Sequence, residues 1–163
     1  MFSAIRRNVA WRAIPVAGLA AGTVFLLATI ILTPVLYQLP PMLMLRYFGS
    51  LALGPGVLVG TGAFALIVGV LVHYALSVIA ALVIAIIVHR WGILVGIGLG
   101  ALLGVAIYGI NVFSMTRFFP WFFAINGWVL FISHVLFGAV AGGVYERLDR
   151  FDVPLTEASD VQK

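Results

Sequence analysis

An apolar run without charged side chains occupies positions 91–116 and reads WGILVGIGLGALLGVAIYGINVFSMT. Three further uncharged runs cover residues 13–45, 47–89 and 118–145. Each run exceeds the roughly 20 residues that an α-helix needs to cross a hydrocarbon core of about 30 Å. The sequence therefore predicts an all-α, polytopic integral membrane protein with four transmembrane helices in one bundle.

The composition of the 163 residues also favours the bilayer. Hydrophobic residues make up 64% of the chain and charged residues 9%, whereas soluble domains are about half apolar and about one quarter charged. All five carboxylates follow position 145, which excludes transporters that use Asp or Glu at membrane depth. The absence of Cys excludes disulfides and thiolate sites. The nine Lys and Arg residues lie near span ends, where they suit phospholipid headgroups rather than nucleic acid.

We expect a single transmembrane domain over residues 1–153. Its predicted spans are residues 13–33, 58–88, 92–113 and 122–145. The first span should stop near Pro34, and a short interfacial helix should cover residues 42–51 in the first outer connector. Residues 154–163 form a polar tail that we expect to be disordered and cytoplasmic.

The basic residues predict the orientation of the chain. One side of the four spans carries Arg6, Arg7, Arg12, Arg90, Arg147, Arg150 and Lys163, and the other carries only Arg46 and Arg117. The positive-inside rule then places both termini in the cytoplasm of a multi-pass protein of the bacterial inner (plasma) membrane. The expected interfacial anchors are Arg46, Tyr47, Arg90, Trp91, Arg117 and Trp121.

Glycines recur at a spacing that keeps them on one helix face. They are Gly92, Gly96, Gly100 and Gly104 in the third span, and Gly138 and Gly142 one and two turns after His134 in the fourth. In lipid, such stripes of small residues let a second helix backbone approach closely. We interpret the stripes as helix-packing faces within the chain, with an interface to another copy or another subunit as the alternative.

Two histidines fall near the middle of their predicted spans, His73 in the second and His134 in the fourth. Ionisable residues at that depth are costly and often functional. The favoured interpretation is a neutral imidazole bonded to a nearby polar side chain. The candidate partners are Ser77, Asn111, Asn126 and Ser133. The alternatives are haem b held by both histidines, a metal site, or a proton-accepting pair, although we expect no cofactor and no metal.

Five short motifs carry a resemblance to a known family. They are LGPGVL at 53–58, VHYALS at 72–77, VHR at 88–90, FPWF at 119–122 and HVLFG at 134–138. Together they resemble a family of small four-span bacterial membrane proteins, most of them uncharacterised and some labelled sodium:proline symporter. The resemblance implies the four-span fold and no established activity. With no carboxylate in the spans, we expect no sodium-coupled proline uptake.

The function predicted first is that of a non-catalytic accessory or assembly subunit of a larger membrane complex. Its partners would be the lipid bilayer and other membrane subunits, or further copies of the chain, but not nucleic acid. One alternative is a homo-oligomeric channel or small-solute carrier with His73 and His134 along the path. A second alternative is an electron-transfer subunit with haem b. An enzyme is not expected, because no nucleophile, base and ligand set is plainly formed.

Overall fold

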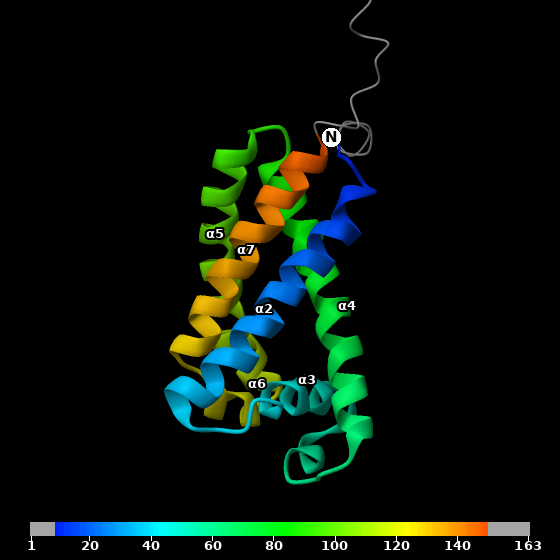
Figure 1. Ribbon diagram of the computed structural model, residues 1–163, viewed down its shortest axis with the longest axis vertical. Helices are drawn as coiled ribbons and strands as arrows, with labels where there is room; N and C mark the ends of the chain where they lie inside the picture. Colours follow the sequence, from blue (N-terminus) through cyan, green and yellow to red (C-terminus); the bar gives the residue numbers. More distant parts are fainter. Residues whose placement is uncertain (1–8, 150–163) are drawn as a thin grey trace, which may run out of the picture.

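Four long helices lie side by side in the computed structural model, which describes residues 9–149 (Figure 1). They are α2 (Ala13–Tyr37), α4 (Ala63–Val88), α5 (Ile93–Ile110) and α7 (Trp128–Asp149). Residues 9–149 contain no β-strand. Each helix is long and apolar enough to cross a membrane, α5 together with its continuation to Phe118. The protein is therefore an all-α, multi-pass membrane protein.

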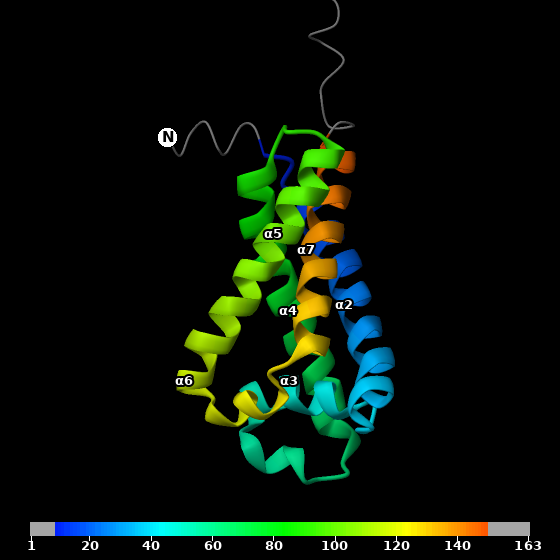
Figure 2. The same cartoon turned by 90° about the vertical axis from the view of Figure 1, so that its left-hand side faces the viewer.

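The short elements gather at one end of the bundle, called here the connector end (Figure 2). They are α3 (Leu43–Leu53), η1 (Pro55–Leu58), η2 (Asn111–Met115), α6 (Thr116–Phe118) and η3 (Pro120–Ile125). Helix α3 lies across the direction of the long helices (Figure 1). The turn between α4 and α5, the start of α2 and the end of α7 lie at the opposite end, which we call the turn end.

Several helix boundaries differ from the predicted ones. Helix α2 continues through Pro34 and ends at Tyr37, where Gln38 adopts a left-handed conformation and donates its N–H to the Pro34 carbonyl. A membrane helix tolerates such a proline. Helix α4 begins five residues later than expected, at Ala63, because η1 takes up the preceding Gly- and Pro-rich segment. Helix α7 likewise begins at Trp128, after the 3₁₀ turn of η3.

The glycine stripes of α5 and α7 face each other inside the same chain. A Cβ added at Gly100 would collide with the Gly138 carbonyl, and one added at Gly142 would collide with the Gly96 carbonyl. Gly104 lies equally close to the backbone of His134. In lipid, the hydrophobic effect does not favour the association of helices, so dispersion contacts must stabilise it. The close approach of the two backbones provides many such contacts. Gly92 does not belong to this face: it precedes α5 at φ 89° and shapes the turn.

A second close approach brings α3 onto α4. A Cβ at Gly49 would meet the carbonyl oxygen of Ala65, and a Cβ at Gly69 would meet that of Leu45. This pair was not predictable from the sequence, because neither glycine belongs to a repeated four-residue spacing. The crossing fixes α3 against the start of α4 and thereby places Phe48 beside the interior of the bundle.

One carboxylate is buried at the turn end, just beyond the last predicted span. Helix α7 continues past 145 to Asp149, and Glu146 is only 2% exposed. Its carboxylate accepts hydrogen bonds from two backbone N–H groups, that of Trp91 at 3.1 Å and that of Gly92 at 2.8 Å. These two donors precede α5, whose N-terminus favours a negative charge. The predicted tail at 154–163 lies outside the described residues.

Candidate functional site

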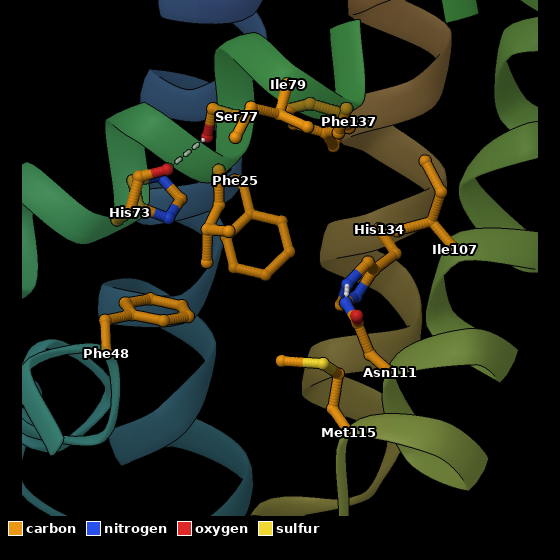
Figure 3. Close-up of a pocket in the computed structure, with 12 residues that line it drawn as sticks. Phe25, Phe48, His73, Ser77, Ile79, Ile107, Asn111, Met115, His134 and Phe137 are labelled. Atoms are coloured by element: carbon orange, nitrogen blue, oxygen red, sulfur yellow. Dashed lines mark hydrogen bonds between the residues drawn. The ribbon is translucent and has the colours of Figure 1, made fainter. Parts of the chain in front are cut away.

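A cavity of about 240 Å³ lies where α4 and α5 diverge from their short turn (Figure 3). It is lined by Phe25, Phe48, His73, Leu76, Ser77, Ile79, Ala80, Ile107, Asn111, Met115, His134 and Phe137. A smaller space of about 80 Å³ shares six of these residues and extends to Leu51, Phe122 and Ile125 of the connector end. The two predicted intramembrane histidines therefore line one cavity.

The cavity wall is mainly apolar and open on one side. Phe25 and Phe137 are buried, and Phe48 is half-buried. Leu76 and Ile79 are 42% and 59% exposed although they also line the cavity. Both residues belong to a helix that is long and apolar enough to cross a membrane, so their exposed side chains suit contact with lipid.

His134 has a protein partner at both ring nitrogens. Its Nδ1 lies 2.7 Å from the Leu130 carbonyl oxygen, which only accepts, so Nδ1 carries the hydrogen. Its Nε2 lies 2.8 Å from Nδ2 of Asn111, which only donates. The imidazole is therefore neutral with a fixed tautomer, and the predicted pairing of a histidine with an asparagine occurs at this position.

His73 has a partner at one ring nitrogen only. Its Nε2 lies 2.8 Å from the Gly22 carbonyl oxygen and therefore donates to it. Ser77 does not bond the ring, because its hydroxyl donates to the His73 carbonyl at 2.8 Å. Within the described chain, no residue bonds Nδ1 of His73. No carboxylate lines the cavity to pair with an imidazolium, so the ring is neutral and Nδ1 presents a lone pair.

The geometry does not fit a haem held by the two histidines. Imidazoles bind haem iron through Nε2 in such sites. Here Nε2 of His73 is hydrogen-bonded to the Gly22 carbonyl, and Nε2 of His134 is hydrogen-bonded to the Asn111 amide. The Phe25 ring also lies between the histidines, with centroid distances of 5.3 Å to His73 and 4.9 Å to His134 (Figure 3). A macrocycle would have to displace this ring. The described residues also contain no group of three His, Asp or Glu side chains that could hold a metal ion.

Asn111 reaches the cavity from an unusual element. It is the first residue of η2, a five-residue π-helix that continues α5. Single π-helical turns widen a helix and occur frequently at functional sites. Met115, the last residue of the same turn, also lines the cavity. The sequence indicated Asn111 as a polar candidate but contained no pattern that predicts the π-helix.

Two of the predicted polar candidates lie outside the cavity. The Ser133 hydroxyl donates to the Val129 carbonyl at 2.7 Å, within its own helix. The Asn126 side chain accepts a hydrogen bond from the Tyr108 hydroxyl, and this residue is exposed at the connector end. Neither residue bonds a histidine, so of the four candidate partners only Asn111 fills that role.

The predicted anchors divide into exposed and packed residues. Arg90, Trp91 and Arg117 are exposed, the first two at the turn end. Arg46 lies 3.4 Å from the Val57 carbonyl, to which it donates, and Trp121 donates to the Ser50 hydroxyl at 2.9 Å. Tyr47 was predicted as an anchor but is buried, because its ring packs edge-on against Phe122 at 5.5 Å. Tyr47 and Trp121 thus join the two connectors.

Comparisons with models of protein families, with curated protein sequences and with solved structures find no match for this chain. The resemblance to a four-span bacterial family stays a prediction. The site must therefore be interpreted from its own residues. Sequence reasoning missed Phe25, Phe48, Met115 and Phe137, because apolar side chains in so hydrophobic a chain form no distinctive pattern.

Proposed function

We propose that this protein is a non-catalytic intramembrane binding protein or carrier for a small, mainly apolar molecule that enters from the bilayer. The observation that carries the proposal is the cavity of about 240 Å³, whose apolar wall includes the buried imidazole of His73 and the amide of Asn111. Ligand sites are typically apolar hollows with a few convergent polar groups. The carrier alternative of the sequence analysis placed His73 and His134 along the path, and both histidines line this cavity.

The size of the cavity limits its occupant. An engineered apolar cavity of about 150 Å³ is large enough to bind benzene. A volume of 240 Å³ therefore accommodates one ring with a few additional heavy atoms, or a branched chain of similar size. A longer apolar substituent could leave between Leu76 and Ile79 into the lipid. The occupant should thus be a small lipophile or the ring of a larger one.

The side chains around the cavity favour binding over catalysis. The Ser77 hydroxyl donates to a backbone carbonyl, so it has no general base. His134 is engaged at both nitrogens. No acidic or basic side chain besides the two histidines lines the cavity. These features support a non-catalytic role.

The accessory-subunit hypothesis stays a prediction. The glycine face of α5 was one of its motives, and this face packs against α7 of the same chain. Lipid remains the expected partner of the exposed apolar side chains. Residence in a bacterial inner membrane with cytoplasmic termini likewise remains part of the proposal and depends on the distribution of Lys and Arg.

Saturable binding of a small fluorinated aromatic probe tests the proposal. We expect trifluoromethylbenzene to bind the protein in nanodiscs with a discrete bound ¹⁹F signal. Ala80→Phe places a ring into the cavity and should reduce the affinity at least tenfold, because the added side chain occupies the volume that the probe needs.

The matched control for Ala80→Phe is Ala75→Phe, on the exposed side of the same helix. This variant should bind the probe like the unmodified protein, while both variants share the same lipid background. Probe signals that are identical in empty nanodiscs, in the unmodified protein and in both variants would contradict the proposed function.

A further inference from the structure

The geometry points to a neutral lipophile with a hydroxyl group, such as a phenol that carries an apolar substituent, as the class of molecule that the cavity binds. This inference rests on the proposed function and names its ligand class. It depends on which hydrogen-bonding atoms of the cavity wall remain without a protein partner.

The first such atom is Nδ1 of His73. His73 as a whole is only 4% exposed, and its Nε2 hydrogen is donated to the Gly22 carbonyl. In the neutral ring, Nδ1 is therefore an acceptor that nothing in residues 9–149 satisfies. A polar atom that lacks a hydrogen-bond partner in apolar surroundings is costly, so a ligand that donates a hydrogen bond to Nδ1 would gain more than one that cannot.

The second free group belongs to Asn111, on the opposite wall (Figure 3). One N–H of its amide is donated to Nε2 of His134. The amide oxygen makes no hydrogen bond to another described side chain, and its second N–H is also available. The wall thus offers three acceptors and a single donor. The third acceptor is the Ser77 hydroxyl oxygen, whose own hydrogen is donated to the His73 carbonyl.

This inventory favours a hydroxyl over a carbonyl or an ether. A hydroxyl donates one hydrogen bond and accepts another, so it can donate to Nδ1 of His73 on one wall or pair with the amide of Asn111 on the other. A ketone, ester or ether only accepts, and it leaves Nδ1 of His73 unpaired. No Asp, Glu, Lys or Arg lines the cavity, so the preferred molecule is uncharged.

A matched set of fluorinated probes tests this inference on the unmodified protein in nanodiscs. The probes are 4-(trifluoromethyl)phenol, 4-(trifluoromethyl)anisole and trifluoromethylbenzene, each corrected for its partition into empty nanodiscs. We expect the phenol to bind at least tenfold more tightly than either of the others. Because trifluoromethylbenzene is smaller than the phenol, weaker binding of that probe cannot result from steric exclusion.

The variant His73→Gln tests whether the preference for the phenol depends on Nδ1 of His73. A glutamine amide can still donate to the Gly22 carbonyl, but it lacks the ring acceptor at Nδ1. The ratio of the affinity for the phenol to the affinity for trifluoromethylbenzene, both measured on this variant, should fall at least threefold. Ser133→Ala, whose hydroxyl bonds within α7 away from the cavity, is the control and should keep the full preference.

The outcomes separate the two proposals. Equal corrected affinities of the three probes, still abolished by Ala80→Phe, would overturn the hydroxyl inference and leave the proposed binding function intact. A failure of all three probes to bind saturably would overturn the proposed function itself. The comparison of probes on the unmodified protein decides the inference even where His73→Gln does not fold.

Discussion

Gly100→Leu is expected to disrupt the contact between α5 and α7 and to lower the free energy of unfolding by about 3 kcal/mol or more. The reason is steric: even a Cβ at Gly100 would collide with the Gly138 carbonyl and would approach the Cα of Gly142. Backbone atoms cannot rotate away as a side chain can, so the helices would have to separate. That separation would remove dispersion contacts along the whole glycine face.

Thermal unfolding of the purified protein in mild detergent measures this effect. A loss of 3 kcal/mol corresponds to a fall in Tm of about 6 °C or more for a chain of this length. Gly98→Leu and Gly109→Leu are the controls, because a Cβ at either position has no neighbour within 4 Å. A Tm of Gly100→Leu equal to that of these controls would refute the packing interpretation.

Glu146→Gln is expected to destabilise the turn end by about 2–4 kcal/mol. The buried carboxylate accepts two backbone N–H groups, at 3.1 Å and 2.8 Å, and charged acceptors make the stronger hydrogen bonds. A glutamine retains one acceptor oxygen but turns an NH₂ group toward the other N–H. It also removes the negative charge at the start of α5. The turn formed by Trp91 and Gly92 would thus lose one of its two hydrogen bonds to the Glu146 side chain, together with the charge that strengthens the other.

Hydrogen exchange at the turn end, read together with Tm, measures the loss. We expect the amides of Trp91 and Gly92 to exchange at least tenfold faster in Glu146→Gln, with a Tm lowered by about 5–10 °C. Arg147→Gln changes the charge of the adjacent, exposed residue and serves as the control. Unchanged protection of the two amides would show that the carboxylate does not hold the turn.

The membrane spans were predictable because long uncharged runs leave few alternatives to a helix in lipid. The boundaries were less predictable. Pro34 reads as a stop in the sequence, yet the last turn of α2 continues past it. Residues 58–62 read as part of a span by hydropathy, yet η1 and two glycines keep them out of α4. Hydropathy reports burial in lipid and does not distinguish an α-helix from an apolar connector.

The candidate site was predictable only in its polar part. His73, Asn111 and His134 were recognisable because polar residues are rare in the spans. The partner of His73 is a backbone carbonyl, at Gly22, which no side-chain pattern encodes. Phe25 could not be identified because its role depends on how α2 packs beside both histidines. Glu146 followed the last apolar run, and only the extension of α7 buries it.

The central claim is that the cavity between α4 and α5 holds a small lipophilic molecule, and photolabelling with site mapping tests it most directly. A trifluoromethyl-phenyl diazirine of single-ring size would be photolysed with the protein in nanodiscs, with and without excess unlabelled 4-(trifluoromethyl)phenol. We predict competable label on cavity residues such as Phe48, Met115 and Ile107, and non-competable label on the exposed residues Leu102 and Phe113. Label that is confined to exposed residues, or that excess phenol does not reduce at the cavity, would contradict the account.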